Sequence, residues 1–164
     1  MSICLNSKPY YGWSKIGKKC TTLNKNKIVD NKRYSLLMAT SNKKIINYSI
    51  VKGAINSLKF TNFIKKIHKN NYVYFLDNAI IHKSKHFKNY ANINNLNIVY
   101  NDPYHSEFNP IENIFSMLRN DILRNNNNTF DDIINTITNF KINTESLKLT
   151  NIFNHSFKLL NNYV

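Results

Sequence analysis

Two acidic residues are candidates for chemistry because of the segments that precede them. Asp77 follows residues 72–76, a short run of aromatic and β-branched side chains that is typical of a strand packed on both faces. A charged residue at the carboxyl end of such a strand lies where α/β proteins place ligands and catalysts. Glu112 lies in the first turn of a predicted helix. Mg²⁺ takes oxygen ligands and commonly uses one or two carboxylates with substrate phosphate oxygens, so a converging pair would favour metal and phosphate chemistry.

The segment between the two residues must bring them together. Residues 81–93 have the apolar spacing of an amphipathic helix, and residues 96–100 form a second short apolar run. This order predicts a strand, a helix and a strand, with the two strands parallel and adjacent. Apolar side chains at helical spacing then form one stripe that must lie on the sheet: Ile111, Ile114, Phe115, Leu118 and Ile122. Glu112 lies at the edge of that stripe, so it can converge with Asp77.

A structural role for both carboxylates is equally compatible with the spacing. Asn109 is a good N-cap and Pro110 suits the first helical position, so Glu112 falls at the third. Glu112 could therefore complete a capping box with Asn109. Asp77 could cap the helix that follows its strand. The spacing by itself does not separate these roles from metal binding.

The motifs around the two carboxylates resemble those of a known family. Residues 76–82, LDNAIIH, and residues 103–113, PYHSEFNPIEN, resemble the second and third catalytic blocks of mariner-like DDE transposases and their bacterial insertion-sequence relatives. The usual family forms are close to D-N-A-x-x-H and P-P-Y-S-P-x-L-N-P-I-E. The 34 residues 78–111 separate the two carboxylates, a spacing that defines branches of the family. Three positions depart from the pattern and alter the turn but not the carboxylates: Asp102 for Pro, His105 for Ser and Ser106 for Pro.

The resemblance implies a fold that agrees with the order of the predicted elements. Residues 33–40 and 44–51 are strand-like and outline a β-hairpin, and residues 2–5 look like the tail of another strand. Three antiparallel strands, a helix and the strand-helix-strand unit then follow in the order of an RNase H-like fold. We therefore expect an α/β domain with a mixed sheet of about five strands, three antiparallel and then two parallel, flanked by helices.

The resemblance also implies a reaction and roles for particular residues. In the family, a metal-bound water cuts DNA at the transposon ends, and the freed 3′-hydroxyl attacks target DNA at a two-metal site that uses Mg²⁺ or Mn²⁺. Asp77 and Glu112 are implied as the catalytic metal ligands. The supporting positions of the motifs, which would hold backbone or phosphate or cap the helix, are Asn78, His82, Asn109 and Pro110. His82 fits a surface position on a helix equally well.

The first catalytic carboxylate of the family has no match in this sequence. Residues 10–20, YYGWSKIGKKC, resemble the segment shortly after that Asp, a register that places the family's Asp-Glu pair immediately before Met1. Neither Asp30 nor Asp102 is expected to replace it, because Mg²⁺ requires close ligand geometry. We therefore expect an incomplete or decayed copy with little or no strand-cleaving activity by itself.

Length and composition are consistent with one folded domain of 164 residues, 42% hydrophobic and 13% aromatic. Residues 1–124 are predicted to form the catalytic core, truncated at its first strand, and residues 125–164 a helical extension of the same domain. No apolar run approaches the roughly 20 residues that span a bilayer, and no signal peptide is apparent. We expect an intracellular location, in the nucleus or wherever the element's DNA resides. Cys4 and Cys20 lack the spacing of a zinc site.

The formal net charge of +14 favours a polyanionic partner, since Lys and Arg displace counterions from phosphates. AT-rich codons could supply part of that charge, because Asn, Lys and Ile are all abundant. Four lysines on the exposed side of a helix capped by Asn56 or Ser57 are expected to form a solvated face: Lys59, Lys65, Lys66 and Lys69.

Three function classes follow from these observations. The first is a DDE transposase catalytic domain that acts on transposon ends and target DNA, where pairing two ends would require at least a homodimer. The second is a non-catalytic DNA-binding remnant. The third is an RNase H-like nuclease or resolvase.

Overall fold

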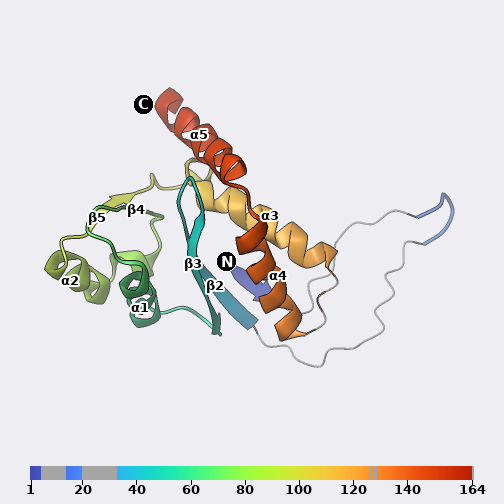
Figure 1. Cartoon of the computed structure of the whole chain (residues 1–164), viewed down its shortest axis with the longest axis horizontal. Coiled ribbons are helices and arrows are strands. Elements are labelled where there is room, and N and C mark those ends of the chain that lie inside the picture. Colours follow the sequence, from blue (N-terminus) through green and yellow to red (C-terminus); the bar gives the residue numbers. More distant parts are fainter. Residues whose placement is uncertain (5–13, 20–32, 126, 128, 164) are drawn as a thin grey trace.

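The computed structural model describes residues 1–4, 14–19, 33–125, 127 and 129–163. These residues form five strands, five α-helices and two short 3₁₀ helices (Figure 1). In chain order they are β1 Ser2–Cys4, β2 Arg33–Thr40, β3 Ile45–Lys52, α1 Ser57–Ile67, β4 Val73–Leu76, η1 Ile80–Lys83, α2 Lys85–Ile93, β5 Asn97–Tyr100, η2 Ser106–Phe108, α3 Pro110–Arg124, α4 Phe130–Asn143 and α5 Ser146–Tyr163. Within the described part of the chain, no helix is long and apolar enough to cross a membrane.

The strands form two sheets. β1, β2 and β3 pair antiparallel in that order, and β4 pairs with β5 in parallel, so the strand directions are as predicted. The prediction of a single sheet of about five strands is not confirmed. β1 has only three residues and pairs with the beginning of β2, and Met1 adds backbone bonds to Leu36. Beyond Leu36, no described strand pairs with β2 on that side to connect it with β4.

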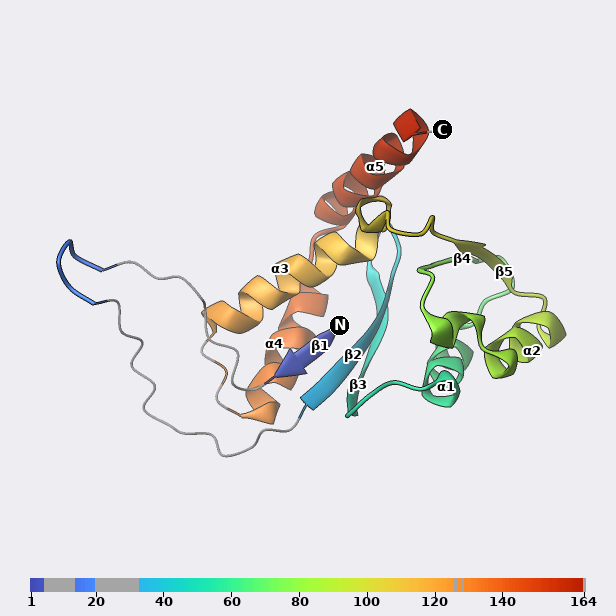
Figure 2. The same ribbon diagram turned by 180° about the vertical axis from the view of Figure 1, so that it is seen from behind.

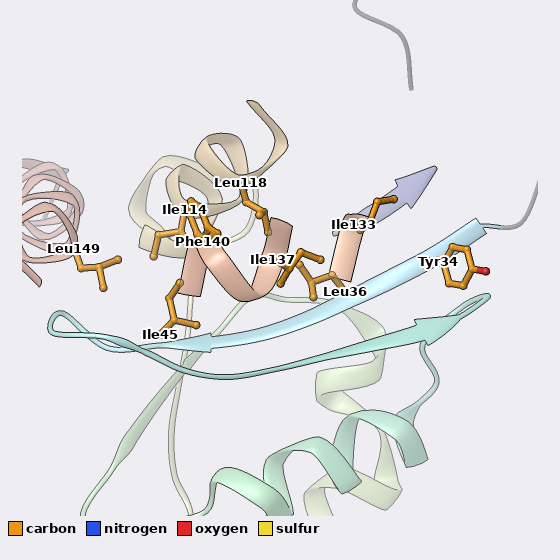
Figure 3. Close-up of a cluster of buried hydrophobic side chains, with 9 residues drawn as sticks. All are labelled: Tyr34, Leu36, Ile45, Ile114, Leu118, Ile133, Ile137, Phe140 and Leu149. Carbon is orange, nitrogen blue, oxygen red and sulfur yellow. The ribbon is translucent and has the colours of Figure 1, made fainter. Parts of the chain in front are cut away.

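The β2–β3 hairpin lies between two hydrophobic cores, which its alternating side chains supply in turn. Tyr34, Leu36 and Ile45 face the first core, where they pack with side chains of α3, α4 and α5 (Figure 3). Leu37 and Ala39 pack instead against the second core, which contains buried side chains of α1, β4 and α2. Seen from both sides, α3 and α4 lie on one side of the hairpin, and α1, α2, β4 and β5 lie on the other (Figures 1 and 2).

The single helix predicted over residues 81–93 is two elements in the structure. The 3₁₀ helix η1 ends at Lys83, and α2 begins at Lys85. Ser84 between them has an extended backbone, and its hydroxyl accepts a hydrogen bond from the Phe87 N–H and donates one to the Ile81 carbonyl. A serine hydroxyl that satisfies helix-end groups makes such a break favourable, although the apolar spacing continues through it.

The helix that carries Glu112 begins where the sequence predicts. Asn109 is the N-cap of α3, and Pro110 is its first residue. Ile114 and Leu118 of its apolar stripe are fully buried in the first core. The cap therefore fixes where α3 begins, and the stripe fixes its rotation about its own axis.

Candidate functional site

Asp77 comes directly after the last residue of β4, and its carboxylate is half exposed. Its Oδ1 accepts a hydrogen bond from the Ala79 N–H at 3.0 Å and lies 2.7 Å from Nδ1 of His82. The hydrogen bond from His82 lowers the pKa of Asp77, against partial burial, which raises it. Among the described residues Oδ2 has no hydrogen-bond partner. One carboxylate oxygen thus orients the group, and the other is available to a cation.

His82 is a partly enclosed residue rather than a freely exposed one, since its side chain is only 13% exposed. Its ring packs against Phe60 of α1 with ring centroids 4.2 Å apart. The Tyr100 hydroxyl at the end of β5 donates to the His82 carbonyl at 2.9 Å. Contacts from α1 and β5 therefore hold the residue that bonds to Asp77.

Glu112 is exposed in the first turn of α3 and does not form a capping box. The Asn109 side chain accepts from the Ile111 N–H at 3.3 Å, and the Glu112 N–H donates to the Asn109 backbone carbonyl. The described hydrogen bonds include none from the Glu112 carboxylate to the N-cap. Asn109 and Pro110 are buried, so the base of the turn is fixed while the Glu112 carboxylate faces solvent.

Both carboxylates act electrostatically on one point, the amino group of Met1. This group donates to the Leu36 carbonyl at 3.0 Å. Burial lowers its pKa, whereas the negative charges of Glu112 and Asp77 each oppose that shift. Arg119 of α3 is also close enough to contribute. The two residues singled out in the sequence thus come from different elements and lie on either side of one positively charged group.

Asn101 joins the segments that carry the two carboxylates, a role that the sequence reasoning missed. Its side chain is 7% exposed, and its backbone N–H donates to the Leu76 carbonyl at the end of β4. Its carbonyl accepts from the Asn78 side chain, and its own amide group donates to the His105 carbonyl. The signal was available, since Asn101 follows β5 as Asp77 follows β4.

The loop before α3 is covered by the end of α5. The His105 ring stacks on Phe108 at 4.8 Å, and its Nδ1 lies 2.8 Å from Glu107. Tyr163 packs its ring 4.5 Å from His105 and 5.1 Å from Phe108. His105 departs from the family pattern, and this contact with the C-terminal helix gives it a role in supporting the loop.

The donor set fits one hard divalent cation better than two. In residues 1–4, 14–19, 33–125, 127 and 129–163, no three His, Cys, Asp or Glu side chains are grouped so as to hold a metal. Asp102 is exposed after β5 and belongs to no such group, and Asp30 lies outside the described residues. Two carboxylates supply the oxygen ligands that Mg²⁺ prefers, with waters or phosphate oxygens to complete its shell.

Comparisons with known proteins identify related sequences and folds. The sequence profile of the family described as DDE superfamily endonuclease matches residues 1–136. A comparison with curated proteins found no match. The fold resembles a pre-cleavage Mos1 transpososome (TM-score 0.79, 10% identity, 99% of this chain and 53% of that one) and the Mos1 strand transfer complex (0.76, 12%, 99% and 50%). It also resembles the Mos1 transposase catalytic domain with raltegravir and Mg (0.71, 12%, 82% and 77%).

These structural likenesses fall at 10–12% identity and concern the fold alone. The chain spans about half the length of the chains in the two Mos1 assemblies. The mixed α/β arrangement of five helices and two small sheets is thus similar to that of the Mos1 catalytic domain.

Proposed function

We propose a function from the premise that this chain belongs to the DDE superfamily endonuclease family. It is the catalytic domain of a DDE-type transposase, and Asp77 and Glu112 are its carboxylates for metal-assisted phosphoryl transfer on DNA. The observation that supports this most directly is that both carboxylates, from separate elements, act on the amino group of one residue. Each is also exposed rather than buried in a hydrophobic core.

We also propose that the two sheets belong to one RNase H-like sheet, interrupted between β2 and β4. Helix α1 supports this, because its buried face packs in one core with Leu37 of β2 and Tyr74 of β4. The core would comprise residues 1–124, with a truncated first strand, and residues 125–164 would be a helical extension of the same domain. The packing of Leu149 of α5 in the first core favours counting the extension with the core.

Mg²⁺ or Mn²⁺ would be held by Asp77 and Glu112. The two Mos1 structures whose titles name a metal contain Mg in one case and Mn in another. Such an ion lowers the pKa of bound water and stabilises charge at phosphorus. The residues of this chain supply orientation: Ala79 and His82 fix one oxygen of Asp77, and the Asn109 cap fixes the turn before Glu112.

DNA is the proposed partner. The titles of the similar Mos1 structures name a strand transfer complex and a transposon end. Pairing two ends would require at least a homodimer. With only two carboxylates at the site, the chain by itself would have little strand-cleaving activity. A non-catalytic role in binding DNA is therefore the second candidate, and the absence of a third acidic group among the described residues favours it.

A metal titration tests the role of the carboxylates. We expect weak Mn²⁺ binding by the wild-type chain, followed by water-proton relaxation, and a loss of about tenfold or more in Asp77→Asn and in Glu112→Gln because each removes a charged ligand. Glu145→Gln makes the same charge change at the start of α5 and should bind as wild type does. Equal affinity in all four proteins would refute the metal site.

A nicking assay with supercoiled DNA and Mg²⁺ tests activity separately. We expect no more nicking by the wild-type chain than by Asp77→Ala. Robust Mg²⁺-dependent nicking that disappears in Asp77→Ala would show that two carboxylates suffice. That result would overturn the inactivity while supporting the assignment of Asp77.

A further inference from the structure

The positive charge of this protein is segregated along the chain. Residues 1–100 contain 18 Lys and Arg against two Asp, whereas residues 101–164 contain five Lys and Arg against seven Asp and Glu. A codon bias that enriched the sequence in lysine would act on both parts alike. The bias therefore does not account for where the charge is, and the distribution has to be explained by the surface that it forms.

The described part of that charge is concentrated in residues 57–100, here called the α1–α2 lobe. The lobe comprises α1, β4, η1, α2 and β5, and it lies across the β2–β3 hairpin from α3 and α4 (Figures 1 and 2). Its only acidic residue is Asp77, against seven lysines, a net charge of +6. All seven lysines are exposed: Lys59, Lys65, Lys66, Lys69, Lys83, Lys85 and Lys88.

Tyrosine rings, and not carboxylates, hold three of these lysines in place. The ammonium groups of Lys65, Lys69 and Lys83 lie 5.4 to 5.5 Å from the ring centroids of three tyrosines, respectively Tyr90, Tyr72 and Tyr100. The negative face of each ring attracts the cation without neutralising it. No ion pair joins a lobe lysine to Asp or Glu in the described residues. The ammonium groups thus retain full capacity for an external anion.

The charged surface begins at the candidate site. Lys83 follows His82, and its ammonium group lies over Tyr100, whose hydroxyl bonds to the His82 carbonyl. His82 in turn bonds to Asp77. A polyanion that reaches Asp77 would therefore meet Lys83 next. From Lys83 the chain leads directly into α2, which packs against α1 through Phe87 and Phe60.

We propose that the exposed surface of the α1–α2 lobe binds the phosphate backbone of duplex DNA beside the position that Asp77 occupies. This inference rests on the proposed function, which makes DNA the partner, and it replaces the solvated face expected for the α1 lysines. An 11-residue helix such as α1 is about 16 Å long, which matches the length of duplex that carries roughly ten phosphate charges. Lysine contacts of this kind are independent of base sequence.

Salt-dependent DNA binding by the full chain tests the proposal. The lobe variant carries Lys65→Gln, Lys66→Gln and Lys69→Gln. The matched control carries Lys44→Gln, Lys148→Gln and Lys158→Gln, which remove the same charge from the exposed hairpin turn and α5. The probe is a 30-base-pair duplex of arbitrary sequence, and anisotropy gives the affinity at salt concentrations from 50 to 200 mM. Circular dichroism melting checks that each variant is folded.

We expect the lobe variant to bind more weakly at low salt and to lose most of its salt dependence. Each phosphate contact contributes about 0.9 to the slope of log affinity against log salt, so three lost contacts remove roughly 40-fold of the fall in affinity between 50 and 200 mM. The control variant should keep the wild-type slope.

Each other outcome overturns a stated part of the proposal. If the wild type binds and both variants lose slope equally, the lobe is not the interface, and the proposed function stands. The lobe is also refuted if its variant weakens binding to duplex RNA but not to duplex DNA. No binding by the wild type would count against the proposed function as well.

Discussion

Asp77 is oriented by contacts that lie close to it in the sequence. The N–H of Ala79, two residues away, and the ring of His82, five residues away, both bond to Oδ1. Such local bonds need only a turn after the strand, which is why the spacing within residues 76–82 carries information about the site. The Phe60 ring, which supports His82 from α1, could not be assigned from spacing.

The hydrogen bond from His82 has a measurable consequence for the ionisation of Asp77. Because this bond lowers the folded-state pKa, the stability it contributes is present above the unfolded pKa, about 3.9, and is lost as pH falls through the folded value. In His82→Phe, which keeps a ring against Phe60, the titration midpoint of Asp77 should rise. Carboxyl-detected NMR titration of both proteins measures it, and identical midpoints would contradict the role of His82.

Helix caps operate at the scale of the element, and most were readable from residue type. Asn56, Ser84, Asn109 and Thr129 each accept a backbone N–H in the first turn of their helix, as expected of short polar side chains. At Ser84 the cap prevailed over the apolar periodicity. The C-terminal helix shows the opposite limit. It begins at Ser146 and not near residue 150, and it buries Leu149 while Phe157 is 42% exposed.

The capping box of α4 provides a test at this scale. The Thr129 hydroxyl accepts from the Asp132 N–H, and the Asp132 carboxylate accepts from the Thr129 N–H. Thr129→Ala should lower the free energy of unfolding by about 1 kcal/mol, because it leaves a helix N–H without its partner. Asn135→Ala, at an exposed position inside the same helix, should not destabilise the protein. Urea unfolding measures both, and equal effects would argue against the cap.

For the whole molecule, the β2–β3 hairpin makes the two cores interdependent. Leu36 faces one core and Leu37 the other, so unfolding of either core exposes one face of the same strand. The two sheets are not hydrogen-bonded to one another in the described residues. Their connection therefore depends on side-chain packing, mainly that of α1 across both.

Truncation in either core should consequently shift a single unfolding transition. Leu36 is 1% exposed and Phe87 is fully buried. We expect Leu36→Ala and Phe87→Ala each to lower the free energy of unfolding by about 2–5 kcal/mol. Leu58→Ala, where the leucine is 52% exposed, should change it by about 0.5 kcal/mol or less. Two transitions, followed by circular dichroism and hydrogen exchange, would mean that the cores fold independently.

The sequence by itself determined the local features: the β2–β3 hairpin, the parallel pair around Asp77, the Asn109 cap and the rotation of α3. Each depends on residue type or periodicity within about ten neighbours, so short-range physics decides it. Only the tertiary structure decided that the strands form two sheets, that Asn101 and Tyr163 hold the loop before Glu112, and that the lysines gather on one lobe. These features depend on contacts between segments far apart in the chain, which periodicity does not encode.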